Sequence, residues 1–342
     1  MCPPIGCNAK TAGFSFEMAQ VYLTIPSNTV YNLMKKGEFR LKQGFIFVLI
    51  TALLFATLEP VSKLIAGEIL PLVMTFLRFL AGGLLLLPVS ISKIRKTQLK
   101  LSVRDYFCMV GLGVLNICIS MVLLQYAVLK AESPALIAII FSCNSVLTIV
   151  LAAIVLKDPI TVKKIAALIL CIIGILICSY KSLQTATGLL SVVYAVLSAV
   201  SFSVYTVFSK KLMVRISGPV QTGISFLMGS AVLFVVLLIL RVNPFEGINT
   251  GNIWHMLYLG IGVTGLGYWA YFKALEKASA TAASIAFFIK PILTPFISFL
   301  IVGTPFHTEV FVALVFVLAG SYLASYADAL QTRTHRNEAG NE

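Results

Sequence analysis

The sequence predicts an all-α integral membrane protein with ten transmembrane helices, arranged as two inverted five-helix repeats. Of its 342 residues, 59% are hydrophobic and only 11% are charged, and the mean hydropathy is +0.97. Soluble domains carry about 25% charged residues. A soluble fold of this length could not cover so much apolar surface, so we expect a chain that crosses a bilayer several times.

Ten apolar runs are long enough to span a bilayer, and the connections between them are short. These lengths leave no room for a large extramembrane domain. The expected spans are 44–66, 70–90, 106–128, 134–156, 162–180, 188–208, 219–240, 254–275, 281–302 and 308–327.

The chain repeats itself with a single offset of 147 residues. Phe79 returns as Phe226, and Lys63 returns as Lys210. Each copy holds five spans, which is an odd number, so the second copy must enter the bilayer upside down. We expect the first repeat over 41–182 and the second over 183–327. Inverted repeats of this kind are typical of secondary transporters.

The net charge of +13 is distributed unevenly over the expected loops. With the N-terminus inside, 19 basic residues fall on the cytoplasmic side, whereas the other side carries only Lys63, Lys130, Lys181 and Arg241. The positive-inside rule therefore predicts cytoplasmic N- and C-termini. The charge indicates contact with anionic lipid rather than with nucleic acid.

The two ends of the chain lack the pattern of the spans. We expect 1–40 to be an N-terminal tail, either disordered or an over-extended start, because Met34-Lys35-Lys36 reads like a start before the first span. Residues 328–342 are expected to be a polar, disordered C-terminal tail. The seven Cys residues show no metal-like spacing, so we expect neither a metal site nor a cofactor.

Lys290 is the most informative polar residue inside a span. It lies near the middle of the ninth span, too deep to reach an interface easily, and Pro291 and Pro295 follow it. A charge beside helix-breaking prolines at mid-depth is typical of a substrate site. The alternative is a structural lysine paired with a helix C-terminus or with Glu59.

Glu59 and Arg78 are the other ionisable residues well inside spans, where a charge costs at least about 2.5–3.5 kcal/mol. Glu59 is able to hold a substrate ammonium, carry a proton or neutralise Lys290. In the alternative it simply pairs with Lys63 one turn further on. Arg78 is either a static clamp on neighbouring carbonyls or a substrate contact.

Amide and aromatic side chains complete the expected lining of the cavity. Under the 147-residue offset Asn144 corresponds to Pro291, so it also lies at mid-depth. The remaining candidate lining residues are Asn116, Tyr205, Tyr268 and Trp269.

The segment Gly260-Ile-Gly-Val-Thr-Gly265 matches the spacing of a dinucleotide-binding loop. That interpretation needs a preceding strand, whereas these glycines lie in an apolar span and favour close helix packing. The three histidines lie at span ends, in loops or in a tail, so no catalytic group can be assembled in the membrane. We therefore do not expect an enzyme.

Several segments resemble the EamA-type transporters of the drug/metabolite transporter (DMT) superfamily over about residues 40–327. They are the first-span stretch Phe55-Ala-Thr-Leu-Glu-Pro-Val-Ser-Lys63, the pair Arg78-Phe79, and the linkers Tyr126-Ala-Val-Leu-Lys-Ala-Glu-Ser-Pro-Ala135 and Ala274-Leu-Glu-Lys-Ala-Ser-Ala-Thr-Ala282. The resemblance implies an inner-membrane carrier with a central cavity between its halves. The sequence departs from the family pattern at Lys290, a site that is often acidic or neutral.

The expected function is therefore secondary transport of a small polar metabolite, an amino acid or a related compound, as efflux by alternating access. One alternative is an exchanger of organic anions or phosphorylated metabolites. Another, of a different class, is a membrane enzyme or a receptor without transport. Expected partners are the substrate and the lipid bilayer. Coupling to protons stays open, and so does the choice between monomer and homodimer.

Overall fold

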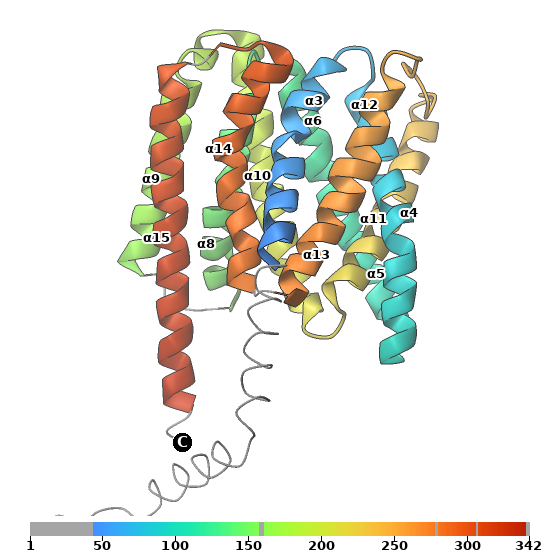
Figure 1. The fold of residues 1–342 in the computed structure, drawn as a ribbon, viewed down its shortest axis with the longest axis vertical. Coiled ribbons are helices and arrows are strands. Elements are labelled where there is room, and N and C mark those ends of the chain that lie inside the picture. The colour runs from blue at the N-terminus through green and yellow to red at the C-terminus, as the bar shows by residue number, and fades with distance from the viewer. Residues whose placement is uncertain (1–43, 157–160, 278–279, 306, 340–342) are drawn as a thin grey trace, which may run out of the picture.

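The computed structural model describes residues 44–156, 161–277, 280–305 and 307–339 (Figure 1). The expected N-terminal tail over 1–40 lies outside these residues. The described residues form helices and no β-strand, apart from one isolated bridge between Ala66 and Ile69 in a turn. The all-helical prediction is confirmed for this part of the chain.

Helices occupy each of the ten expected places. The first is Gly44–Leu64, and its last part is α3 (Leu58–Leu64). The others follow in chain order: α4 (Pro71–Thr97), α5 (Val103–Gly113), η1 (Val114–Met121), α6 (Val122–Lys130), α7 (Pro134–Ser142), α8 (Asn144–Leu156), α9 (Val162–Ser179), η2 (Ser182–Gln184), α10 (Ala186–Met213), α11 (Gly218–Ile239), α12 (Ile253–Leu257), η3 (Tyr258–Leu266), α13 (Gly267–Lys277), α14 (Ala280–Val302) and α15 (Thr308–Ala339).

Seven of these helical stretches are long and apolar enough to cross a membrane, and shorter apolar helices cover Ala286–Val302 and Thr308–Ala324. Large apolar side chains remain exposed on outward faces, such as Leu176 on α9 and Leu300 on α14. Such faces suit contact with lipid. The chain is thus a multi-pass membrane protein, whereas the count of ten spans and their inversion stay predictions.

The last helix corrects the expectation of a disordered C-terminal tail. α15 continues to Ala339, well past residue 328 (Figure 1). The segment 328–339 contains neither Gly nor Pro, and Gly340 follows directly. The local sequence therefore holds no helix-breaking residue between 328 and 339.

Proline and polar caps set several helix starts. Pro71, Pro134 and Pro219 lie in the first turns of α4, α7 and α11, where a missing N–H costs nothing. α5 begins with a reciprocal capping box between Ser102 and Asp105.

Two helix pairs make the most extensive contacts, α9 with α15 and α4 with α11. Figure 1 shows the long α15 running beside α9 at one side of the bundle. Between α4 and α11, Phe79 and Phe226 meet edge to face with ring centroids 4.7 Å apart. These are two residues that the 147-residue offset relates.

Glycines allow α5 and α11 to approach closely. A Cβ atom added at Gly113 would lie 2.5 Å from the carbonyl oxygen of Ser225, and one at Gly229 would lie 2.7 Å from that of Gly113. Small residues at helix contacts let backbones approach in this way in membrane proteins.

Candidate functional site

A buried ion pair joins α3 to α14. The ammonium of Lys290 donates to Glu59 Oε1 at 2.6 Å. Glu59 is fully buried, and the Lys290 side chain is 7% exposed. The Lys290 Nζ also lies 5.2 Å from the ring centroid of Phe141 on α7, so it is held between a carboxylate and an aromatic ring.

Pro60, directly after Glu59, leaves one backbone carbonyl of the helix without its usual hydrogen-bond donor. Pro60 has no N–H, so the carbonyl of Ala56 receives no helical hydrogen bond from it. The Thr294 hydroxyl, one turn after Lys290, reaches this carbonyl at 3.2 Å and the carbonyl of Lys290 at 2.9 Å. The first helical stretch, Gly44–Leu64, and α14 are thus joined twice, once by the ion pair and once by the hydrogen bond to the Ala56 carbonyl.

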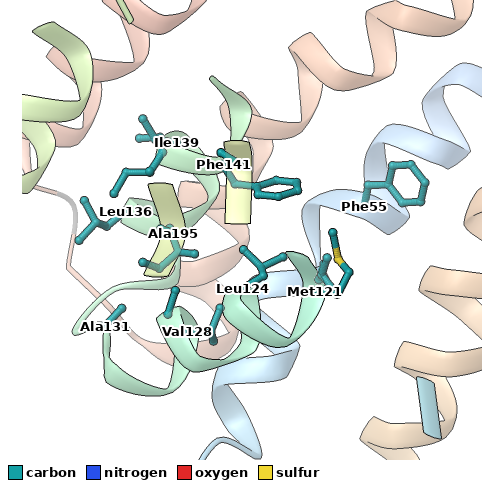
Figure 2. Packing of buried hydrophobic residues seen from close by; sticks show 14 of the residues in the cluster. Phe55, Met121, Leu124, Val128, Ala131, Leu136, Ile139, Phe141 and Ala195 are labelled. Carbon is teal, nitrogen blue, oxygen red and sulfur yellow. The ribbon is translucent and has the colours of Figure 1, made fainter. Parts of the chain in front are cut away.

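A cavity of about 60 Å³ lies beside this ion pair. That volume holds a few water molecules or one small polar group. Its lining residues are Phe55, Leu58, Arg78, Met121, Phe141, Ser142, Asn144, Ser145, Phe202, Val263, Thr264, Tyr268, Phe287 and Lys290. Figure 2 shows Phe55, Met121 and Phe141 on three different helical segments of the apolar core.

Arg78 brings a second cation to the cavity. Its side chain on α4 is 1% exposed, and its Nε and Nη1 atoms have no hydrogen-bond partner among the described residues. The guanidinium carbon lies 4.7 Å from the ring centroid of Phe79. Neither carbonyl clamping nor an ion pair accounts for those two N–H groups.

Irregular helix surrounds the cavity. The α7–α8 helix is interrupted at Cys143, directly before Asn144. The third and eighth helices contain the π-helical segments η1 and η3, which supply Met121 and Thr264 to the lining. π-Segments often occur at functional sites.

The expected break at Pro291 and Pro295 is not where the helix is interrupted. α14 continues through both prolines, and the breaks lie at Thr57 and Cys143 instead.

The structure brings five of the eight candidate residues together. Arg78, Asn144, Tyr268 and Lys290 line the cavity, and Glu59 is paired with Lys290 behind it. Tyr268 also contacts the rings of Phe55 and Phe226 at 5.2 and 5.0 Å between centroids.

The other three candidates lie outside this lining. Tyr205 packs behind Phe202 with centroids 5.5 Å apart. Trp269 points to Phe47, which it meets edge to face at 5.6 Å. The Asn116 side chain is buried in η1, and neither its amide oxygen nor its nitrogen has a partner in the described part of the chain.

Sequence reasoning missed the small hydroxyl residues of the lining, Ser142, Ser145 and Thr264. Thr264 lies within the glycine-rich stretch that predicted only close packing. The serines lie on either side of Asn144, and this cluster was an available signal.

Comparison with known proteins identifies the family. The model of the EamA-like transporter family matches residues 42–180 and again 189–326. The chain belongs to the EamA-like transporter family. It is therefore a membrane transporter of small molecules.

The relatives of this EamA-like transporter carry general names. An uncharacterized transporter of Clostridium kluyveri is 33% identical over 290 residues, which cover 83% of this chain and 93% of the relative. The uncharacterized transporter YyaM of Bacillus subtilis is 26% identical over 72% of this chain and 80% of its own length. The protein PecM of Dickeya dadantii is 27% identical over 61% of this chain and 70% of its own.

A solved crystal structure shares the fold with a TM-score of 0.60. It is 17% identical, and the match covers 84% of this chain and 98% of that one. At this identity the likeness concerns the fold alone.

Both family matches contribute to the site of this EamA-like transporter. Glu59, Arg78 and Asn144 belong to the first matched stretch, and Tyr268 and Lys290 belong to the second. The Glu59–Lys290 ion pair therefore connects the two.

Proposed function

We propose that this EamA-like transporter moves a small polar metabolite, an amino acid or a related compound, out of the cell by alternating access. In this proposal ten spans form two inverted five-helix repeats, 41–182 and 183–327. The termini face the cytoplasm, and the protein lies in the inner membrane. The uneven distribution of basic residues supports this orientation.

The observation that carries the proposal is the charged cavity shared by the two matched stretches. Lys290 and Glu59 come from different stretches and contact each other at 2.6 Å. A movement of one half against the other must lengthen or break this contact. Discontinuous helices around a site shared by two repeats are typical of alternating-access carriers, and the interruption at Cys143 supports that mechanism.

The test is counterflow in proteoliposomes that contain the purified protein. Vesicles loaded with an unlabelled amino acid mixture should accumulate labelled amino acids, and Lys290→Ala should abolish the uptake. Uptake that survives Lys290→Ala at the wild-type rate would show that the proposed site is wrong.

Two neighbouring aromatic residues provide a matched pair of variants. Tyr268→Phe removes a hydroxyl from the cavity lining, whereas Trp269→Phe changes a ring that packs on Phe47 outside it. We expect Tyr268→Phe to slow counterflow and Trp269→Phe to leave it near the wild-type rate. Equal effects of the two would contradict the assignment of the cavity.

Exchange of organic anions is the second candidate function. It is favoured by the pairing of Lys290 with Glu59, which leaves Arg78 as a cavity cation without an acidic partner among the described residues. Counterflow driven by preloaded organic anions rather than amino acids distinguishes the two. Proton coupling through Glu59 is tested in the same vesicles by imposing a pH gradient, which should drive net transport only in the coupled case.

A further inference from the structure

Arg78 is a buried cation whose charge is not neutralised within the described part of the chain. Of the two cations that line the cavity, Lys290 is paired with Glu59 at 2.6 Å. The Arg78 guanidinium contacts the face of Phe79, and its Nε and Nη1 donors have no hydrogen-bond partner among those residues. A guanidinium is charged and carries five N–H donors that suit a carboxylate, and those on Nε and Nη1 of Arg78 are available for one.

The charges around the cavity sum to one excess positive charge. Glu59 cancels Lys290, and the hydroxyls of Thr264 and Tyr268 add no charge. A zwitterionic ligand would leave the excess uncompensated, and its ammonium would compete with Lys290 for Glu59. A ligand with one net negative charge would neutralise the site, and buried charges are stable only when they are compensated.

We infer that the substrate is a small monoanion whose carboxylate binds Arg78, and that the Glu59–Lys290 pair positions the site rather than binding the charge. This inference rests on the proposed function, because it takes the cavity to be the transport site, and it favours the second candidate substrate class, organic anions, over zwitterionic amino acids. It assigns net charge as the property by which substrates are selected.

The experiment measures binding to the purified full chain by thermal shift, since a ligand that binds the folded state raises its apparent stability. The probes are three matched series of three, four and five carbons: the carboxylates propionate, butyrate and valerate, the corresponding α-amino acids, and the corresponding amides. We expect the carboxylates to bind at least about tenfold more tightly than either neutral series.

Variants on one helix identify the group responsible. Arg78→Gln should abolish stabilisation by the carboxylates, and Arg78→Lys, which keeps the charge and loses the fork, should weaken it about 10-fold. Arg95→Gln removes an exposed arginine from the same helix and should bind like the wild type. If Arg78→Gln fails to fold, the comparison of Arg78→Lys with the wild type still tests the fork.

The inference is overturned if amino acids or amides bind as tightly as carboxylates, if no carboxylate binds, or if both Arg78 variants bind carboxylates like the wild type. Its failure differs from that of the proposed function. Carboxylate binding without counterflow in proteoliposomes contradicts transport alone, whereas counterflow of amino acids with wild-type rates in Arg78→Lys contradicts the charge rule alone.

A second inference rests on different contacts, at the two ends of the bundle. Arg215 Nη2 lies 2.9 Å from Asp105 Oδ2, and Asn252 Nδ2 donates to Glu68 Oε2 at 2.8 Å. Asn252 follows Asp105 by the repeat offset of 147 residues, and Arg215 follows Glu68 by the same offset. The two contacts are therefore equivalent in the repeat.

Their local settings also correspond. At one contact, Ser102 N donates to Asp105 Oδ2 at 2.7 Å and Asp105 N to Ser102 Oγ at 3.4 Å. At the other, Asn249 N donates to Asn252 Oδ1 at 2.9 Å and Asn252 N to Asn249 Oδ1 at 3.0 Å. Each contact thus joins the segment at the start of a helix in one matched stretch, α5 or α12, to a connection in the other stretch.

The two contacts lie at opposite ends of the molecule. Glu68 precedes α4 and Asp105 follows it, and the 27 residues of α4 span about 40 Å. Figure 1 shows the start of α4 beside α12 and its other end beside α5. We propose that Asp105–Arg215 and Glu68–Asn252 are equivalent latches, one closing each entrance, and that transport opens them alternately. This proposal also rests on the proposed function.

Cysteine accessibility tests the latches. Ser142→Cys, which places a thiol in the cavity lining, is introduced after replacement of the seven native cysteines, and oriented vesicles are treated with an impermeant maleimide from either side. Asp105→Asn should speed labelling several-fold from the Asp105 side only, and Glu68→Gln from the opposite side only.

The double variant Asp105→Arg with Arg215→Asp is the control. It restores opposite charges at this contact, so its labelling rate should return towards that of the parent protein. Faster labelling from the same side in both single variants, or unchanged labelling in both, overturns the proposal.

Discussion

The Lys290 ammonium and the Glu59 carboxylate contact each other at 2.6 Å although 231 positions separate them in the chain. Both side chains are buried, so each needs the other as its counter-charge.

Removing one member of this pair should destabilise the protein strongly. Glu59→Gln or Lys290→Met leaves an uncompensated buried charge, which costs about 3–5 kcal/mol. The double variant should recover most of this loss. The measurement is thermal unfolding of the purified protein in a double-mutant cycle. The exposed pair Lys181–Glu309, at 2.7 Å, is the control, and its loss should change stability by about 0–1 kcal/mol. Additive effects at Glu59 and Lys290 would refute the coupling.

The Thr294 hydroxyl should matter because Pro60 leaves the Ala56 carbonyl without its helical donor. Thr294→Val removes the 3.2 Å hydrogen bond and should cost about 0.6–1.7 kcal/mol, the usual range for hydrogen bonds within membrane proteins. Thr294→Ser should retain most of the stability. In a Pro60→Ala background, which supplies the missing N–H, the cost of Thr294→Val should shrink. If Thr294→Val lowers stability by the same amount in the Pro60→Ala background, the Ala56 carbonyl is not the hydrogen-bond partner through which Thr294 stabilises the protein.

Two glycines of α5 should respond in opposite ways to alanine. At Gly113 a new Cβ would meet the Ser225 carbonyl oxygen at 2.5 Å, whereas nothing lies within 4 Å at Gly111. Gly113→Ala should destabilise by about 1–3 kcal/mol through overpacking. Gly111→Ala should be neutral or stabilise by up to about 1 kcal/mol, because alanine favours helix. Thermal unfolding of the two variants tests this. A smaller loss of stability in Gly113→Ala than in Gly111→Ala would contradict the close approach of α5 and α11.

Lys63 should stabilise the end of α6. Its ammonium donates to the carbonyls of Val128, Leu129 and Ala131 at 3.2, 3.2 and 2.5 Å. A positive charge at this place is favourable because the C-terminus of a helix carries a partial negative charge. Lys63→Met should therefore lower stability by about 1–2 kcal/mol. Lys210, its equivalent by the repeat offset, is exposed, so Lys210→Met is the matched control and should have little effect. Similar losses in both variants would contradict a specific role of Lys63 as a cap.

Helix positions could be predicted well from the sequence, and the assembly of the site only in part. Continuous apolar runs determine where a membrane helix lies, because the bilayer requires them. They do not determine which face of a helix points inward. Tyr268 and Trp269 are adjacent and equally plausible from sequence, yet only Tyr268 reaches the cavity.

Two physical causes explain the gap. The π-segments η1 and η3 add residues to a turn, so a period of 3.6 residues misplaces the side chains that follow. The partner of Glu59 depends on long-range packing as well. Lys63 was the local alternative, but its ammonium turns to the end of α6, and Lys290 takes the carboxylate.

The edge-to-face contact of Phe79 and Phe226 joins two residues that hold the same place in the two copies of the repeat. In the isologous interface of a twofold homodimer, equivalent residues face each other in the same way. The contact of Phe79 with Phe226 is not symmetric in that sense, because in an edge-to-face pair one ring presents its edge and the other its face. The two copies of the repeat therefore meet here through equivalent residues that play unequal parts, and a substitution in one copy is not the same experiment as the corresponding substitution in the other.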